Sequence, residues 1–262
     1  MSKLLKGLGY VIIGLFILFI LAPILIIIPV SFGDNMFQFP PSGFSFDLYQ
    51  QFIQDEMILS SIGLSLYIGL LSTLIACLVG LFAALGISKG YFPFKGVLET
   101  FFLGPLIVPF VTTGIGFLIF FVPLNLIDSP VSIVIAHSIV ISPYVVRICL
   151  ATLRQLEGVL EEAAIVHGAS PWYAFRTVIL PQMLPALIAG GFLAFLVSMD
   201  EYTVTVFLAQ ANTITLPIRI FQYVTMDINP VVTALSSISV VISLVLIAIL
   251  EKKLKIHRYL EF

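Results

Sequence analysis

The sequence predicts an all-α membrane protein with six transmembrane helices. Of its 262 residues, 60% are hydrophobic and only 10% are charged, whereas about 25% of the residues in a soluble domain are charged. Six apolar segments reach the length of about 20 residues that a helix needs to cross a bilayer. Their residues do not alternate between polar and apolar, as they would in a membrane β-barrel. A helical bundle is therefore expected.

The predicted spans cover residues 10–30, 61–87, 97–122, 131–150, 185–209 and 231–249, and we expect residues 1–262 to form a single domain. Each span must bond its own backbone N–H and C=O groups, because lipid offers no partners. The first span follows Lys3 and Lys6, as in a secretory signal, but it is longer and has no small-residue cleavage site. We therefore expect it to be retained. Pro105 and Pro109 are expected to kink the third span.

The basic residues predict the orientation of the bundle. All of them except Arg219 fall on one side, namely Lys3, Lys6, Lys89, Lys95, Arg147, Arg154, Arg176, Lys252, Lys253, Lys255 and Arg258. Membrane proteins retain lysine and arginine on the cytoplasmic side. Both termini are therefore predicted to be cytoplasmic.

The outer side is acidic and carries the longest of the outer loops, residues 31–60. Its acidic residues are Asp34, Asp47, Asp55, Glu56, Asp128 and Asp227. They would concentrate cations at the mouth of the bundle, or they simply follow from the exclusion of basic residues. Residues 44–52 are predicted to form a short helix along the membrane surface, where an outside partner would dock.

The composition excludes several kinds of function. A net charge of −2, without a run of like charges, leaves no surface for nucleic acid. Cys77 and Cys149 lie far apart without a neighbouring His or Cys, which argues against a zinc site or a disulfide. No nucleophile with a base and no paired catalytic carboxylates can be assembled outside the spans. Neither catalytic nor metal-binding residues are therefore predicted.

The long cytoplasmic loop, residues 151–184, is predicted to contain two helices. The first covers residues 153–167 and ends at Gly168, because glycine suits the left-handed conformation that closes a helix. The second begins with Ser170 as its cap and Pro171 at its first position, and ends near Pro181.

Aromatic residues are concentrated in the second of these helices. Trp172, Tyr173 and Phe175 lie there together with Arg176. Such residues are enriched at protein interfaces, but Trp and Tyr also collect at the surface of a bilayer. The sequence is compatible with both roles.

The same loop carries a family motif. Glu162-Ala163-Ala164, Gly168, Val178, Leu180 and Pro181 match the pattern E-A-A-x3-G-x9-I-x-L-P, with Val178 in place of Ile. The chain thereby resembles the permease subunits of binding-protein-dependent ABC importers, whose EAA loop has this pattern. The resemblance implies the type I importer permease (MetI-like) fold and a location in the bacterial inner membrane.

The resemblance also implies how the protein is driven. The residues that would couple to an ATPase are Glu162, Ala163, Ala164, Gly168, Ser170, Pro171, Trp172, Leu180 and Pro181. The chain has no phosphate-binding loop of the form G-x-x-x-x-G-K-[ST], so ATP and Mg²⁺ are expected on a partner chain. The implied partners are two ATPase subunits, a second and different permease chain, an extracytoplasmic substrate-binding protein and membrane lipid.

Charged residues inside a span are candidates for the substrate pathway. The fifth span contains Ser198, Asp200, Glu201, Tyr202 and Thr203. Adjacent helical residues point about 100° apart, so only one of the two carboxylates is expected to face the pathway squarely. Alternatively, both satisfy backbone groups freed at a broken helix.

His137, in the fourth span, is a further candidate. A buried, hydrogen-bonded histidine is the favoured interpretation, and a gate or proton relay is the alternative.

The last two spans resemble the spermidine/putrescine-type permeases. The matching stretches are Ser198-Met-Asp-Glu, Thr215-Leu-Pro-Ile-Arg and Asn229-Pro-Val-Val-Thr-Ala-Leu-Ser. The resemblance implies polyamine passage along Asp200 and Glu201. Leu106 after Pro105, and Leu48 in the outer loop, depart from that family's pattern, so aminophosphonates and amino acid-like solutes are alternative cargoes. A different class, an ion-coupled carrier or channel without an ATPase, is disfavoured by the lack of a paired inverted repeat.

Overall fold

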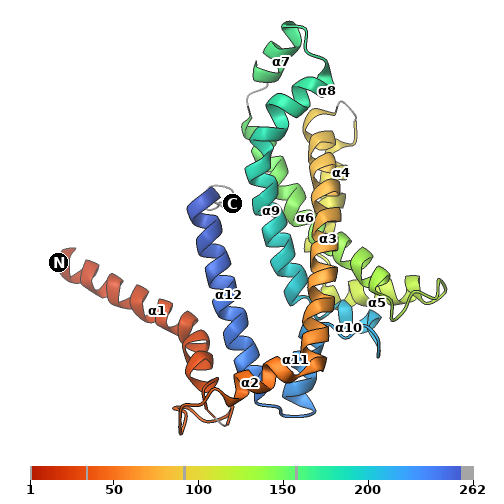
Figure 1. Ribbon diagram of the computed structural model, residues 1–262. Coiled ribbons are helices and arrows are strands. Elements are labelled where there is room, and N and C mark those ends of the chain that lie inside the picture. The colour runs from red at the N-terminus through yellow and green to blue at the C-terminus, as the bar shows by residue number, and fades with distance from the viewer. Residues whose placement is uncertain (1, 34, 91–92, 157–158, 255–262) are drawn as a thin grey trace. The chain divides into compact units, whose positions relative to one another are not determined.

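The computed structural model describes residues 2–33, 35–90, 93–156 and 159–254, and every regular element in these ranges is helical. Figure 1 shows the helices in chain order. They are α1 (Ser2–Val30), α2 (Asp47–Gln54), α3 (Glu56–Lys89), α4 (Lys95–Leu103), η1 (Gly104–Leu106), α5 (Phe110–Phe121), α6 (Pro130–Gln155), α7 (Val159–Val166), α8 (Pro171–Ala174), η2 (Phe175–Ile179), α9 (Leu180–Asp200), α10 (Thr205–Leu208), α11 (Leu216–Thr225) and α12 (Val231–Leu254). Lys255 and Arg258, used to orient the C-terminus, lie outside the described residues.

The chain divides into two compact units. The first unit comprises Met1–Leu59 and Ile220–Ile249, and the second comprises Ser60–Arg219 and Leu250–Phe262. The prediction of a single domain over residues 1–262 stays a prediction.

In the first unit, polar side chains hold the start of α3. Asp55 Oδ1 accepts the backbone N–H groups of Met57 and Ile58, each at 3.0 Å, and thereby caps the helix. Asp55 Oδ2 accepts the hydroxyl of Tyr223 at 2.7 Å. Asp55 therefore joins the start of α3 to α11, and it serves this structural role in addition to contributing to an acidic face.

In the second unit, α6 is the central helix. Its side chains form much of a core cluster, and 78% of its apolar window is buried inside the chain. Helices α6 and α9 lie side by side (Figure 1). Helix α3 also approaches α6 closely, because a Cβ atom at Gly80 would lie only 2.6 Å from Val145 Cγ1. Small residues allow such close helix contacts in a membrane.

Four helices are long and apolar enough to cross a membrane. They are Gly7–Val30, Glu56–Lys89, Pro130–Gln155 and Pro171–Asp200. The bent pair described below makes a fifth if it counts as one span, and Val231–Leu246 is a shorter apolar helix. Within the described residues the structure therefore provides four or five spans, and the count of six stays a prediction.

The third predicted span, residues 97–122, is not one continuous helix. Helix α4 ends at Leu103, a 3₁₀ turn follows, and α5 begins at Phe110 after a bend of 98°. Pro105 and Pro109 have no N–H to donate to a helical carbonyl, and Pro109 is extended with ψ 133°. The predicted kink is confirmed, but it breaks the span rather than bending it.

The fifth predicted span, residues 185–209, also differs from the structure. Helix α9 begins at Leu180 and ends at Asp200, and only the single turn α10 follows. The apolar sequence continues past Asp200, but Glu201 adopts an extended conformation with ψ 108°. The Glu201 carboxylate bonds to Val204 and Thr205 and thereby holds this break, together with His137 from α6.

Candidate functional site

Two regions contain the residues singled out from the sequence, except His137 in α6. The coupling segment, residues 159–181, contains the family motif. The α9–α10 break, residues 198–205, contains the charged residues of the fifth span. Both lie in the second unit.

The first half of the coupling segment is a short helix closed by glycine. Helix α7 ends with Ala169 N–H donating to the Ala164 carbonyl at 3.0 Å and Gly168 N–H donating to the Ile165 carbonyl at 2.9 Å. Gly168 has φ +89°, a conformation that L-residues with a side chain seldom adopt. The glycine turn expected from the sequence is therefore present. The predicted helix 153–167 is shorter, because residues 153–155 belong to α6.

The second half begins as predicted. The Ser170 side chain accepts the backbone N–H of Tyr173 at 3.3 Å, and Pro171 occupies the first turn of α8. Trp172 is 67% exposed and Tyr173 is 61% exposed. The Trp172 ring lies 5.4 Å from that of Phe175. An exposed aromatic surface therefore lies directly beyond the glycine turn.

This second helix does not end near Pro181. A π-helical turn, η2, joins α8 to α9, and its cap bond runs from Leu180 N–H to the Phe175 carbonyl. Pro181 lacks the N–H that an α-helix would donate to Thr177, and the wider π turn accommodates this loss. Residues 171–200 thus form one helical rod, about 45 Å long at about 1.5 Å per residue.

One ion pair joins the coupling segment to α3 and another lies beside it between α6 and α4, and sequence reasoning did not single them out. Lys89, at the end of α3, pairs with Glu161 in α7, and Arg154 pairs with Glu99 in α4 at 2.7 Å. The motif residue Glu162, by contrast, is exposed. A groove of about 980 Å³ is lined by Glu161, Glu162, Lys89, Lys95 and part of the π turn. No local pattern in the sequence identifies pairs this far apart along the chain.

At the α9–α10 break, Glu201 is fully engaged within the fold. Its carboxylate accepts the backbone N–H groups of Val204 at 2.7 Å and Thr205 at 3.0 Å, and the Thr205 hydroxyl at 2.8 Å. The residue is only 5% exposed. Glu201 thus satisfies backbone groups freed by the break, whereas the alternative interpretation of the sequence expected this of both carboxylates.

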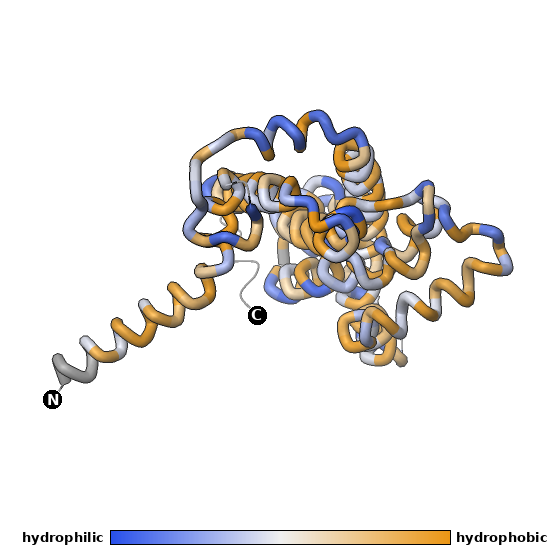
Figure 2. Tube along the Cα trace, turned by 90° about the horizontal axis from the view of Figure 1, so that it is seen from below, coloured by the Kyte–Doolittle hydropathy of each residue, from blue (hydrophilic) through white to orange (hydrophobic). Residues whose placement is uncertain are grey.

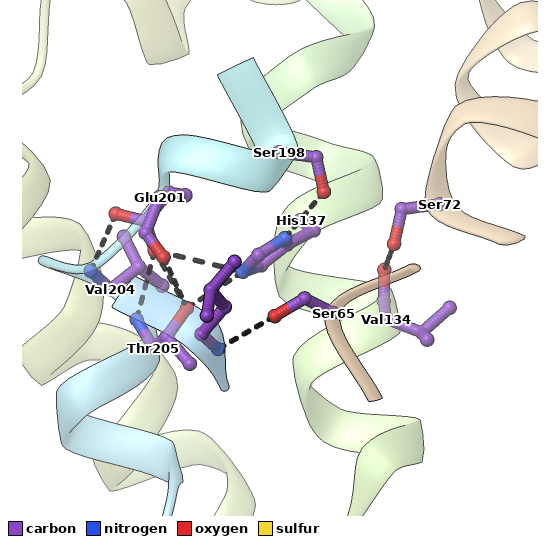
Figure 3. Close-up of polar contacts among 9 residues, drawn as sticks. Ser65, Ser72, Val134, His137, Ser198, Glu201, Val204 and Thr205 are labelled. Carbon is purple, nitrogen blue, oxygen red and sulfur yellow. Dashed lines mark hydrogen bonds and ion pairs between the residues drawn. The ribbon is translucent and has the colours of Figure 1, made fainter. Parts of the chain in front are cut away.

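His137 extends this network from α6. Its Nδ1 lies 2.7 Å from Ser198 Oγ, and its Nε2 lies 2.8 Å from Thr205 Oγ1 (Figure 3). A neutral ring with its proton on Nε2 gives each of these side chains a hydrogen-bond partner. Ser198 then donates to Nδ1, Nε2 donates to Thr205, and Thr205 donates to Glu201. His137 is 2% exposed. The predicted buried, hydrogen-bonded histidine is confirmed.

Asp200 differs from its neighbour. It is exposed, while Glu201 is buried and Tyr202 and Thr203 are half-buried. Among the described residues no hydrogen bond or ion pair is found for the Asp200 carboxylate. The structure thus separates the two carboxylates, because α9 ends at Asp200 and Glu201 is extended. Asp200 is the one available to a ligand.

Asp128 holds the far side of α10, a role that sequence reasoning did not assign to it when it counted Asp128 among the outer acidic residues. Its carboxylate accepts bonds from Asn212 Nδ2 and Thr213 Oγ1, both at 2.7 Å, and from the Gln210 N–H at 3.1 Å. Its own N–H donates to the Leu208 carbonyl at 2.9 Å. Desolvation raises the pKa of Asp128, but these hydrogen bonds together hold it below its usual value. The bonds join the α5–α6 loop to residues 210–213.

Helix α10 is also packed closely against α5. A Cβ atom at Gly114 would lie 2.4 Å from Phe207 Cδ2. Glu201 and His137 at one end, Asp128 at the other and Gly114 on the side therefore hold this single turn. The short backbone between α9 and α10, which directly follows Asp200, is fixed by these contacts.

Comparison with known proteins gives consistent matches. Residues 76–254 match the family described as binding-protein-dependent transport system inner membrane component. The putrescine transport system permease protein PotI of Escherichia coli (strain K12) is 32% identical over 227 residues, covering 84% of this chain and 81% of the relative. The putative 2-aminoethylphosphonate transport system permease protein PhnV of Salmonella paratyphi A is 29% identical over 246 residues, covering 93% and 92%.

Among solved structures, a chain of a bacterial ABC transporter involved in the import of the acidic polysaccharide alginate has the same fold. Its TM-score is 0.77 at 18% identity, with 96% of this chain and 97% of that chain covered.

Proposed function

The chain belongs to the family of binding-protein-dependent transport system inner membrane components, and we propose that it forms one half of the pathway of an ATP-driven importer for a small amine-bearing solute. It is an inner-membrane, non-catalytic permease subunit, and ATP hydrolysis takes place on a separate chain. A substrate-binding protein delivers the solute, and a second permease chain and two ATPase subunits complete the assembly. We place six spans in this subunit and both termini in the cytoplasm, as the distribution of basic residues predicts.

The coupling segment carries this proposal. Its glycine turn presents the exposed residues Trp172 and Tyr173, which suit insertion into a groove of the ATPase. Because α8, η2 and α9 form one rod, a displacement of the exposed aromatic surface moves the far end of α9 as well. That end is Asp200, so movement at the ATPase is transmitted directly to the proposed substrate site.

In the substrate site, Asp200 contacts the cargo, and Glu201 holds Asp200 in position. The Glu201 carboxylate is bonded to α10 and is 5% exposed, so it has no free acceptor to offer a solute. The exposed Asp200 carboxylate suits an ammonium group, because a charged hydrogen bond of this kind is short and strong. Putrescine, named for the relative PotI, is a diamine and fits this chemistry.

A second cargo is supported by a specific finding. The relative PhnV, which covers nearly the whole chain, is named for 2-aminoethylphosphonate. That compound carries an amine like putrescine, but it also carries an anionic phosphonate. Asp200 would bind the amine of either solute. Competition between radiolabelled putrescine and unlabelled 2-aminoethylphosphonate in uptake assays distinguishes the two cargoes.

The test is uptake of radiolabelled putrescine into proteoliposomes that contain the full transporter. Asp200→Asn is expected to lower uptake about tenfold or more at subsaturating solute, because a hydrogen bond to a charged group contributes about 1.5–3 kcal/mol. Asp227→Asn is the matched control, since Asp227 is also an exposed carboxylate. Assembly with the ATPase should stay unchanged in both variants.

Two results would contradict the proposal. Unchanged uptake in Asp200→Asn would remove Asp200 from the pathway while leaving the importer class intact. Uptake that proceeds without the ATPase and follows a proton or sodium gradient would instead favour the ion-coupled carrier.

A further inference from the structure

A loop in the first unit exposes an unusual number of aromatic side chains. We call residues 35–46 the aromatic loop; their sequence is Asn-Met-Phe-Gln-Phe-Pro-Pro-Ser-Gly-Phe-Ser-Phe. Phe37 is 76% exposed, Phe39 58%, Phe44 71% and Phe46 56%. Four large apolar rings within twelve residues form more apolar surface than isolated exposed residues account for.

The aromatic loop is a folded element. Ser45 N–H donates to the Phe32 carbonyl at 2.8 Å and closes its base. The Phe32 ring stacks on that of Phe44 at 4.6 Å and meets that of Phe46 edge-on at 5.4 Å. At its tip, Gln38 N–H donates to the Asn35 carbonyl at 3.2 Å. The exposed rings are therefore held outward by a closed backbone.

Its position places the aromatic loop at the edge of the bilayer. It follows α1, in which no residue from Gly7 to Pro29 is buried inside the chain. Figure 2 shows α1 as an almost uninterrupted hydrophobic helix. The loop precedes α2 and α3, and α3 is also long and apolar enough to cross the membrane. A segment between two spanning helices lies at the depth of the lipid headgroups.

The charge of the aromatic loop selects between possible partners. Residues 35–46 contain no charged side chain. An anionic lipid surface would favour lysine or arginine beside such rings. The aromatic loop has no lysine or arginine, and exposed rings without charge suit the boundary between headgroups and acyl chains.

We propose that the aromatic loop inserts Phe37, Phe39 and Phe44 into the outer leaflet and anchors the outer end of α1 in lipid. The surface of α1 is apolar and the rings continue it beyond Val30. Insertion depends on apolar contact, so it is independent of anionic lipid and of salt.

Spin labels measure this insertion directly. The full chain, with Cys77→Ala and Cys149→Ala, receives one cysteine at Phe37, Phe39 or, as the control, at Gln51 on α2, which is exposed and polar. Each labelled chain is reconstituted into phosphatidylcholine vesicles, with and without its unlabelled partner chains. Collision rates with oxygen, which concentrates in lipid, and with a water-soluble nickel chelate are then compared.

We expect labels at Phe37 and Phe39 to collide several-fold more often with oxygen, and several-fold less often with the chelate, than the label at Gln51. Adding phosphatidylglycerol or salt should leave the ratios unchanged. High chelate accessibility at both positions would overturn the proposal. So would protection from both reagents that requires the partner permease or the binding protein, since the surface would then be a protein interface.

A second measurement avoids dependence on the cysteine variants. The chain has a single tryptophan, so Phe39→Trp in a Trp172→Phe background reports from the loop alone. Lipids brominated near the headgroup should quench its fluorescence strongly, and an unquenched signal would contradict insertion. Because this readout needs no transport, its failure is distinguishable from failure of the importer function.

Discussion

The coupling segment and the α9–α10 break lie at opposite ends of one helical rod. They differ in whether their side chains are exposed or are buried and hydrogen-bonded within the chain. At the coupling end, Trp172 and Tyr173 are more than 60% exposed. At the other end, Glu201 and His137 are 5% and 2% exposed and are bonded within the chain. The first region needs a partner to cover it, whereas the second is complete in the single chain except for Asp200. The rod therefore joins a surface that another protein would cover to a buried hydrogen-bond network beside one exposed carboxylate, that of Asp200.

The largest effect is expected where the buried network is removed. Glu201→Ala leaves the N–H groups of Val204 and Thr205 buried without an acceptor, and each such loss costs about 1–3 kcal/mol. We expect a clear fall in the thermal unfolding temperature of the purified chain, together with loss of transport. Differential scanning fluorimetry in detergent measures the first effect.

Asp200→Ala is the matched control for this change. Removal of an exposed carboxylate should reduce uptake and leave the unfolding temperature nearly unchanged. If both alanine variants unfold at the same temperature, Glu201 does not stabilise the fold more than Asp200 does, and the contrast between the two residues is wrong.

The two regions also differ in how far the sequence could predict them. Gly168 and Ser170 were predictable because a helix stop and a helix cap depend on residues a few positions apart. The end of α9 was not, because Val204, Phe207 and Leu208 continue the apolar pattern past Asp200. Only His137, more than 60 residues earlier, and the bonds of Glu201 explain why the helix stops.

The same limit applies to the bonds that cross between helices. Asp128 and Lys89 have no local pattern that marks them, since their partners lie more than 70 residues away in sequence. The break of the third span was indicated by Pro105 and Pro109, but a bend of 98° is more than prolines alone predict. Segment length, charge and local caps thus predicted the class of fold, and tertiary contacts determined the site.

A backbone change at Gly168 is expected to have the next largest effect. Gly168→Ala places a side chain at φ +89°, which costs about 1–2 kcal/mol. No atom lies within 4 Å of the added Cβ, so the cost arises from the backbone alone. We expect coupled transport to fall several-fold while membrane insertion persists, measured as uptake per ATP hydrolysed. Gly116→Ala, also without a neighbour within 4 Å but helical, is the control, and equal coupling in both variants would contradict this role.

A smaller effect is expected from the ion pair between Lys89 and Glu161. Pairs at this level of exposure contribute about 0.2–1 kcal/mol, so Lys89→Glu or Glu161→Lys alone should lower coupled uptake less than Gly168→Ala. The double exchange should restore it, because the pair reforms with reversed charges. Arg154→Glu with Glu99→Arg is a matched exchange between α6 and α4 that does not touch α7. If the Lys89 and Glu161 double variant remains as impaired as the singles, the ion pair between α3 and α7 does not contribute to coupled uptake.

The smallest effect is expected on stability, from the pH-dependent hydrogen bonds between Asp128 and residues 210–213. Hydrogen bonds from residues 210–213 lower the folded pKa of Asp128 below its ordinary value of 3.8. The stability that they contribute is therefore present above pH 3.8 and is lost as pH falls through the lower, folded pKa. Asp128→Asn should lower the unfolding temperature slightly at neutral pH, and its difference from the wild type should shrink below pH 3.8. Asp227→Asn supplies the comparison, and a constant difference across the acidic range would show that the Asp128 charge does not hold α10.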